Sequence, residues 1–357
     1  MQLKQIAHVL PQSARVNDLG HLEIGALDTV KLVKEYGTPL YIFDEQTLRN
    51  NCRGFLKGFR KHHKNVEVIY ACKAFINISL AKLLNEESLG LDVVSGGELA
   101  IARAVNFPAE KVYFHGNNKS KDELEEAIDF GIGRIVVDNL PELIMVNKLA
   151  ENRGIKQKIL LRITPGVDPH THTHTTTGAL DSKFGFQLPV VGNAIEKSLS
   201  LDNIHLMGIH FHLGSPIFEL KPYEDATSIA LDLTYKYKNQ GFDLKEFSPG
   251  GGFAIAYTRE QHAPAPEEYA KAIVGSLVKA CKKSKIEIPK LIVEPGRAIT
   301  GPACITLYTV GSSKSISGIR KYVSVDGGMG DNIRPALYGS KYEVLPANRM
   351  RNKLSEK

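Results

Sequence analysis

One lysine stands where the sequence can support covalent chemistry with a carbonyl compound. Lys73 follows the apolar run VEVIYAC and precedes AF, so we expect its amine at the end of a buried strand among apolar neighbours. Loss of hydration disfavours the ammonium form, and an uncharged lysine amine can form a Schiff base with an aldehyde. The alternative is an ordinary surface lysine at a strand end.

A run of glycines offers a place for an anion. Gly250, Gly251 and Gly252 follow a short apolar run in the segment SPGGGF. Backbone N–H groups without bulky side chains beside them can surround a phosphate or another anion. A tight turn explains the same triplet, so the glycines alone leave both interpretations open.

Two histidines stand two residues apart in the segment HFHLGS. If both lie on a strand, His210 and His212 face the same way. A metal site is one interpretation, but no carboxylate or third histidine stands at ligand spacing nearby. The other is an imidazole stacked on an aromatic cofactor, with Ser215 donating to a phosphate. Further histidines stand in the Thr-rich segment HTHTHTTTG, where we expect a solvated loop and no metal site: His170, His172 and His174.

The segment EPGR places a carboxylate and a guanidinium around a proline turn. Glu294 follows the apolar run LIV, where it can face a pyridine nitrogen, keep that nitrogen protonated and preserve the ring as an electron sink. Arg297 offers a planar fork that suits a carboxylate or a phosphate. Together with the amine of Lys73, these groups suit pyridoxal phosphate. An exposed Glu–Arg pair at a turn is the alternative.

A second arginine and a tyrosine stand four residues apart in NIRPALY. Residues at this spacing meet on one face of a helix, so Arg334 and Tyr338 lie together if they share a helical turn. Such a pair is suited to binding a carboxylate.

The elements that must hold these residues alternate between strands and helices. Apolar or β-branched runs predict strands at residues 66–71, 91–95, 112–115, 134–138, 159–163, 206–211, 244–248 and 291–294. Segments of helical period lie between them, at residues 78–87, 98–106, 121–130, 140–152, 223–239 and 266–283. These β–α cycles predict an α/β protein with a (β/α)8 barrel of the TIM type. Reactive groups in that fold gather at the carboxyl ends of the strands.

The two flanks predict a second, β-rich domain. Residues 1–38 contain an extended segment, HLEIG, and a helical segment at residues 29–36. After the barrel, CITLYTVG and KYVSVDGG alternate as strands do and are separated by a Ser- and Gly-rich turn. We therefore expect the barrel at residues 39–295 and a β-domain from residues 1–38 and 296–357. The few strands predicted in that domain leave it incomplete at the C-terminus.

Composition excludes several classes of protein. Of the 357 residues, 43% are hydrophobic and 24% charged, which excludes a disordered or fibrous chain. The net charge of +6 comes from basic residues dispersed among acidic ones, so we expect no nucleic-acid partner. No apolar run is long enough to span a membrane, and the first residues do not resemble a secretory signal. The four cysteines form no C-x-x-C pair, and we expect free thiols in the cytoplasm.

In combination the motifs resemble the diaminopimelate decarboxylase family, pyridoxal-phosphate enzymes of the alanine-racemase-like barrel class. The matching segments, in family order, are YACKAF, LDVVSGGEL, FHGNNKS, LRITPGV, DSKFGF, GIHFHLGS, GGGF, EPGR and VDGGMGDNIRPALY. The resemblance implies decarboxylation of meso-diaminopimelate at its D-centre, which yields L-lysine and CO2. It also implies a homodimer with active sites at the subunit interface.

The resemblance assigns roles to individual positions. Lys73 is the residue that would bind the aldehyde of pyridoxal phosphate, His212 would stack on the ring, and Glu294 would face the ring nitrogen. The remaining cofactor-binding positions are Ser215, Gly250, Gly251, Gly252, Pro295, Gly296 and Arg297. The substrate-binding positions are Arg297, Arg334 and Tyr338.

The family pattern also contains a Cys-Glu-Ser-Gly-Asp motif and a later tyrosine, neither of which follows in this sequence. This difference raises the alternative of a truncated, catalytically impaired homologue that binds the cofactor or regulates a full-length subunit. A further alternative keeps the fold and the cofactor but changes the substrate to another basic amino acid or a carboxylated polyamine.

Overall fold

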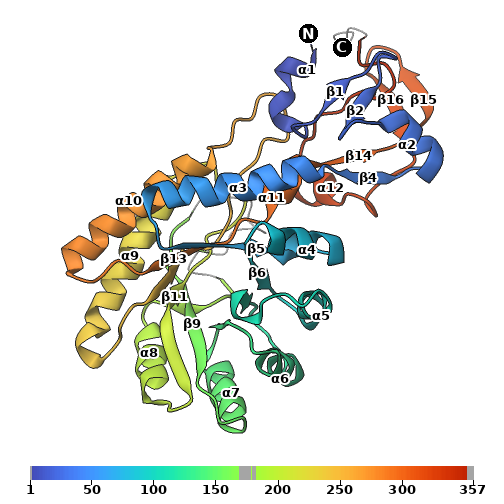
Figure 1. Cartoon of the computed structure of the whole chain (residues 1–357). Helices are drawn as coiled ribbons and strands as arrows, with labels where there is room; N and C mark the ends of the chain where they lie inside the picture. The colour runs from blue at the N-terminus through green and yellow to red at the C-terminus, as the bar shows by residue number, and fades with distance from the viewer. Residues whose placement is uncertain (1, 169–177, 179–181, 352–357) are drawn as a thin grey trace. The chain divides into compact units, whose positions relative to one another are not determined.

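The structure is a computed structural model that describes residues 2–168, 178 and 182–351 (Figure 1). The chain divides into two compact units. Residues 51–254 and 264–298 form the first, which we call the barrel unit. Residues 1–50, 255–263 and 299–357 form the other, which we call the second unit.

A closed ring of parallel strands forms the centre of the barrel unit. In the order in which they pair, the strands are β5 (Val66–Ala71), β6 (Gly90–Val93), β7 (Val112–Phe114), β8 (Arg134–Val137), β9 (Gln157–Thr164), β11 (Ile204–His210), β12 (Glu246–Ser248) and β13 (Lys290–Val293). Strand β13 pairs with β5 and closes the ring, and the short β10 (Phe186–Gln187) adds to β9. Most side chains of these strands are buried, which is why they are apolar and β-branched. The predicted (β/α)8 barrel is confirmed.

Helices connect successive strands and lie outside the ring (Figure 1). They are α4 (Ile78–Glu86), α5 (Gly96–Ala104), α6 (Lys121–Phe130), α7 (Leu140–Glu151), α8 (Val191–Ser200), α9 (Lys221–Tyr237) and α10 (Pro266–Ser284). Another helix, α3 (Glu45–His62), precedes β5, and a short helix, α11 (Arg297–Thr300), follows β13. Six of these helices match the sequence prediction to within a few residues, whereas α3 and α8 were missed.

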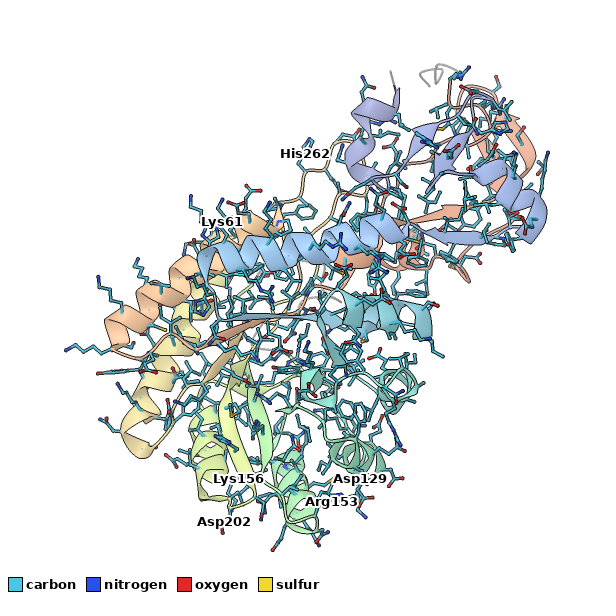
Figure 2. All side chains as sticks on the ribbon, in the orientation of Figure 1. Lys61, Asp129, Arg153, Lys156, Asp202 and His262 are labelled. Carbon is cyan, nitrogen blue, oxygen red and sulfur yellow. The ribbon has the colours of Figure 1, made fainter. Side chains whose placement is uncertain are left out.

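Polar side chains define the helix ends. Ser120 accepts from the N–H of Glu123 at the start of α6, and Glu123 accepts from the N–H of Ser120 in return. This reciprocal arrangement satisfies donors that have no partner within the helix. Outside the barrel, Asp129 on α6 accepts two hydrogen bonds from Arg153, which follows α7 (Figure 2).

The barrel interior is apolar in its middle and charged at one end. A buried cluster takes one residue from each of five strands: Ile69, Tyr113, Val136, Leu160 and Ile292. Below it, Arg134 and Glu246 stand at the first positions of β8 and β12 and form two hydrogen bonds of 2.7 and 2.5 Å. This ion pair therefore closes the amino end of the barrel.

The second unit contains short antiparallel pairs of strands. Strands β1 (Arg15–Val16), β2 (Leu22–Ile24) and β3 (Leu27–Asp28) form one sheet, β4 (Leu40–Phe43) pairs with β14 (Cys304–Leu307), and β15 (Val310–Ile316) pairs with β16 (Arg320–Val325). The predicted helix at residues 29–36 is α2 (Thr29–Tyr36), and the β-rich character is confirmed. No helix among the described residues is long and apolar enough to cross a membrane.

Candidate active site

Polar residues converge at the carboxyl end of the barrel. Because all eight strands are parallel, residues at or just after their last positions share one end of the ring. The residues brought together there are Lys73, Asp92, His115, Arg162, His210, His212, Ser248, Gly250, Gly251, Gly252 and Glu294. The predicted gathering of reactive groups at this end is confirmed.

Lys73 forms an ion pair at the entrance of this cluster. It lies in a short 3-10 helix, Cys72–Ala74, directly after β5. Its Nζ donates to Asp92 Oδ2 at 3.0 Å, and its side chain is 47% exposed while that of Asp92 is fully buried. Lys73 thus presents an accessible amine whose position is set by a buried carboxylate.

The charge of Lys73 differs from the sequence expectation. Burial lowers the pKa of the Lys73 ammonium, but the negative charges of Asp92 and Glu294 outweigh this effect and raise the pKa. The expectation of an amine among apolar neighbours, with its pKa lowered, is therefore wrong. The error came from omitting Asp92, which the chain brings in from the neighbouring strand β6.

Glu294 is a buried carboxylate with two strong partners. Ser248 Oγ donates to Glu294 Oε1 at 2.7 Å, and His210 Nε2 lies 3.2 Å from Glu294 Oε2. Burial raises the pKa of Glu294, but the electrostatic interactions with His210 and His115 and the His210 hydrogen bond outweigh it and lower the pKa to about 2. Glu294 is therefore ionised at neutral pH, as a partner of a protonated ring nitrogen must be.

His212 and His210 occupy different positions. Strand β11 ends at His210, so His212 lies beyond it, and the premise that both stand on one strand is wrong. His212 Nδ1 accepts from the N–H of Gly251 at 3.2 Å. Burial and the positive charge of Lys73 hold the pKa of His212 well below its usual range, so its ring is uncharged.

The glycine triplet allows neighbouring backbone segments to approach closely. Gly250 and Gly252 have φ of +74° and +97°, which favour glycine. A Cβ on Gly251 would overlap the carbonyl oxygen of Glu294, and one on Gly250 would lie 2.5 Å from the carbonyl oxygen of Phe211. In this structure the Gly250 N–H donates to Ser248 Oγ at 3.1 Å. The triplet is thus required where the loops after β11, β12 and β13 meet.

The EPGR turn runs beside the segment that carries Lys73. The carbonyl of Pro295 accepts from the N–H of Ala71 at 3.2 Å. A Cβ on Gly296 would lie 3.0 Å from the Ala71 Cβ, so glycine permits this approach. Arg297 Nε donates to Ser215 Oγ at 3.1 Å. The structure therefore joins Ser215 and Arg297, two positions that the sequence assigned to the cofactor.

Arg334 and Tyr338 lie in the second unit on one short helix, α12 (Arg334–Tyr338), as the four-residue spacing predicted. The Arg334 guanidinium lies over the rings of Tyr257 and Tyr342, 4.6 and 5.8 Å from their centroids. Its Nη1 also donates to Tyr342 Oη at 2.8 Å. These contacts hold the guanidinium in one orientation.

Sequence reasoning left several members of the cluster out of its set of site residues. They are Asp92, His115, Arg162, His210 and Ser248. A charge inside the apolar run LDVV was a signal for Asp92, because a buried charge needs a partner. The hydrogen-bond partner of His210, Glu294, lies 84 residues away in the sequence, so no local spacing reveals the contact.

His115, His210 and Glu294 also have the composition of a metal site, because their ligand atoms lie within 4.8 Å of one another. The positive charges of Lys73 and Arg162, however, act on the same group and oppose another cation. The three histidines of the Thr-rich segment, His170, His172 and His174, lie outside the described residues.

The cluster fits pyridoxal phosphate. Among the described residues, the buried atoms Asp92 Oδ1, His115 Nε2 and His210 Nδ1 have no hydrogen-bond partner. Buried polar atoms without partners are uncommon in folded proteins and point to a ligand site. An accessible amine, an ionised carboxylate for a ring nitrogen, an uncharged imidazole and a Ser–Arg pair beside a glycine-rich loop match the aldehyde, ring and phosphate of this cofactor.

Comparison with known proteins also points to a pyridoxal-dependent enzyme. The pyridoxal binding domain of the pyridoxal-dependent decarboxylases matches residues 46–301. The chain is 44% identical to the diaminopimelate decarboxylase of Bacillus subtilis over 341 residues, covering 95% of this chain and 78% of the relative. It is 42% identical to that of Bacillus methanolicus over 347 residues, covering 96% and 80%. The diaminopimelate decarboxylase of M. jannaschii in complex with L-lysine matches with a TM-score of 0.86 and 32% identity, covering 93% and 77%.

Proposed function

The chain belongs to the diaminopimelate decarboxylase family of pyridoxal-dependent decarboxylases, and on that premise we propose which of its residues serve the reaction. The reaction is the decarboxylation of meso-diaminopimelate to L-lysine and CO2, the last step of lysine biosynthesis. The cofactor is pyridoxal phosphate, which when bound supplies the electron sink for cleavage of the bond to the carboxylate. The relatives favour this substrate over other basic amino acids.

The cofactor-binding residues follow from the contacts at the carboxyl end of the barrel. Lys73 would bind the aldehyde carbon through its amine, Glu294 would bind the protonated ring nitrogen, and His212 would stack on the ring. The phosphate is held by the loops that the Arg297–Ser215 hydrogen bond joins, together with Gly250, Gly251, Gly252, Pro295 and Gly296.

Asp92 sets the protonation of the reacting amine. Its buried carboxylate accepts a hydrogen bond from Lys73 Nζ and favours the charged form of that amine. Lys73 therefore holds a proton at Nζ at neutral pH. It must give up this proton before the amine can bind an aldehyde, and the hydrogen-bonded Asp92 carboxylate is placed to accept it. The half-exposed position of Lys73 gives the substrate access to this atom.

The substrate-binding residues are Arg297, Arg334 and Tyr338. Meso-diaminopimelate carries a distal carboxylate, which a planar guanidinium binds through two hydrogen bonds. The stacking of Arg334 on Tyr257 and Tyr342 supports this role, because an oriented guanidinium loses less freedom when the carboxylate binds.

One observation supports this assignment most strongly. The accessible amine of Lys73 and the ionised carboxylate of Glu294 lie at the same end of the barrel. Lys73→Ala is expected to abolish the long-wavelength absorbance of bound pyridoxal phosphate and to reduce CO2 release from meso-diaminopimelate by at least about a thousandfold. The absorbance of the purified protein and the rate of CO2 release measure both effects.

Lys82→Ala is the matched control, because Lys82 is an exposed lysine on the neighbouring helix α4. It should keep the absorbance and the activity of the unchanged protein. Ornithine, arginine and lysine, tested alongside, should release little CO2. An absorbance that survives Lys73→Ala would show that another residue binds the aldehyde.

The assembly, the cellular location and the functional domains extend this proposal. A homodimer is supported by exposed apolar side chains on β15 and β16, such as Ile316, Tyr322 and Val323, because such patches mark protein interfaces. Light scattering of the purified protein tests it. A cytoplasmic location is supported by the four cysteines, none of which forms a disulfide. The family match over residues 46–301 supports residues 39–295 as the cofactor-binding domain, with residues 1–38 and 296–357 as the second domain.

A further inference from the structure

Two buried histidines contact the carboxylate that is proposed to bind the cofactor ring. His210 Nε2 lies 3.2 Å from Glu294 Oε2, and His115 Nε2 lies 3.7 Å from Glu294 Oε1. Their rings meet edge to face, with centroids 4.8 Å apart and planes at 75°. Both side chains are at least 97% buried, since only 1% and 3% of their surfaces are exposed. Neither histidine belongs to the cofactor-binding set of the preceding proposal.

Hydrogen-bond chemistry determines which nitrogen of His210 carries a proton. An ionised carboxylate only accepts hydrogen bonds, so the proton of this contact must stand on His210 Nε2. His210 Nδ1 is buried without a hydrogen-bond partner among the described residues. The geometry therefore places a proton on His210 Nε2, directed at Glu294.

His115 connects Glu294 to the ion pair of Lys73. Its Nε2 lies 3.7 Å from Asp92 Oδ1 as well as 3.7 Å from Glu294 Oε1. Burial, followed by smaller electrostatic effects, holds the pKa of His115 well below its usual range, so the ring is uncharged between these carboxylates. Its Nε2 is beyond hydrogen-bond distance of both carboxylates, so the uncharged ring packs between them without adding a net charge.

The charged groups around Glu294 are nearly balanced among the described residues. Two carboxylates, Asp92 and Glu294, face two cations, Lys73 and Arg162. Two side chains, those of Ser248 and His210, form hydrogen bonds with Glu294, while the rings of His115 and His212 lie nearby. A buried carboxylate stays ionised only when such donors replace its hydration.

We propose that His210 and His115 are positioning residues that keep Glu294 ionised and fix its direction, so that Glu294 can bind a protonated pyridine nitrogen. This inference rests on the proposed function of Glu294. It predicts that loss of either histidine weakens cofactor binding even though neither is assigned to the cofactor itself. It further predicts a change in the protonation of the bound ring.

The decisive comparison is His210→Leu against His210→Gln. Leucine removes the donor, whereas the amide N–H of glutamine reaches about as far as Nε2 and can still donate to Glu294. The dissociation constant of pyridoxal phosphate, measured by absorbance titration of protein freed of cofactor, should rise at least about tenfold for His210→Leu and less than about threefold for His210→Gln. His115→Leu should raise the dissociation constant by a smaller factor, because His115 contacts Glu294 at 3.7 Å without a hydrogen bond.

A pH titration of the cofactor absorbance provides an independent measurement. An ionised Glu294 raises the pKa of the ring nitrogen, so a less ionised Glu294 should let the ring lose its proton at lower pH. The midpoint of the absorbance change should therefore move to lower pH in His210→Leu and return in His210→Gln. Ser248→Ala removes the hydroxyl that donates to Glu294 Oε1, with little change of volume. It should move the midpoint in the same direction.

Thr227→Val provides the control for a change in a buried polar residue. Thr227 is buried in the barrel unit, and its hydroxyl has no partner among the described residues. This variant should keep both the dissociation constant and the midpoint. If the leucine variants lower only the melting temperature and keep both values, the histidines are structural and the inference is overturned. If the unchanged protein fails to bind pyridoxal phosphate, the proposed function fails and this inference with it.

Discussion

At the scale of residues, three histidines at the carboxyl end of the barrel make different contacts. His212 accepts from a backbone N–H of the glycine triplet, His210 donates to Glu294, and His115 lies between Glu294 and Asp92. Of the three, only His212 entered the cofactor-binding set from the sequence, because imidazole stacking on a ring is a recognisable role. The other two contact the carboxylate of Glu294, which follows strand β13.

The glycine triplet yields a prediction at this scale. In Gly251→Ala the new Cβ would overlap the Glu294 carbonyl oxygen, so the backbone must shift in the region that positions Glu294. We expect the free energy of unfolding to fall by about 2 kcal/mol and the bound cofactor per chain to decrease. Urea denaturation and the absorbance of the purified protein measure the two effects.

Gly275→Ala is the matched substitution, because a Cβ on Gly275 meets nothing within 4 Å on helix α10. Alanine there should leave the cofactor content unchanged and raise the free energy of unfolding by up to about 1 kcal/mol. Equal effects of the two substitutions would contradict the close approach inferred at Gly251.

At the scale of elements, periodicity predicted most of the helices but missed α3. Its composition is strongly polar, which hid a stripe of apolar residues spaced four, three and four apart: Leu48, Cys52, Phe55 and Phe59. All four are buried. The stripe has the spacing of one helix face, so a count of apolar positions by period, rather than by composition, would have found α3.

The start of α6 provides a prediction at the scale of elements. Ser120 caps this helix, and the Glu123 carboxylate also accepts from the N–H of Gly96 at 2.8 Å at the start of α5. Ser120→Ala removes the cap and one of the groups that orient Glu123. We expect the free energy of unfolding to fall by about 1 kcal/mol in urea denaturation.

Ser200→Ala is its control, because Ser200 is an exposed serine at the last position of α8. It should change the free energy of unfolding by less than about 0.5 kcal/mol. A Ser120→Ala variant as stable as Ser200→Ala would show that the cap contributes nothing measurable.

At the scale of the whole molecule, the two ends of the barrel serve different purposes. The carboxyl end carries the proposed cofactor site, and the amino end is closed by the buried pair of Arg134 and Glu246. In a barrel of this type the amino end contributes to stability, while the loops at the other end carry the chemistry. The second unit shows a different organisation, since it draws on three separate segments of the chain.

Arg134→Met tests the separation of the two ends. It leaves the buried Glu246 carboxylate with Lys290, 3.9 Å away, as its cation. We expect the free energy of unfolding to fall by about 3 kcal/mol, because a buried charge without its partner is strongly unfavourable. The affinity for pyridoxal phosphate, measured on the folded protein, should stay within about twofold of the unchanged value.

The double variant Arg134→Met with Glu246→Leu serves as the comparison. Removing both charges should recover most of the lost stability. A weakened cofactor affinity in the single variant, at a temperature where it is folded, would contradict the independence of the two ends.

Residues 255–263 show what the sequence did not reveal about the molecule as a whole. They stand between β12 and α10 in the chain, yet they belong to the second unit. There the carbonyl of Tyr257 accepts from the N–H of Glu343 at 2.9 Å, and Arg259 pairs with Glu343. The sequence analysis assigned them to the barrel domain because nothing in their composition separates them from it.

The sequence by itself determined the alternation of strands and helices and the barrel, and it indicated Lys73, Glu294 and the glycine triplet as candidate site residues. These features depend on local period and on residue type, which the chain carries in order. The tertiary structure alone decided that Asp92 pairs with Lys73, that His210 and His115 contact Glu294, and that Tyr257 stacks on Arg334. Such contacts join residues far apart in sequence, and only the closure of the ring and the association of separate segments bring them within bonding distance.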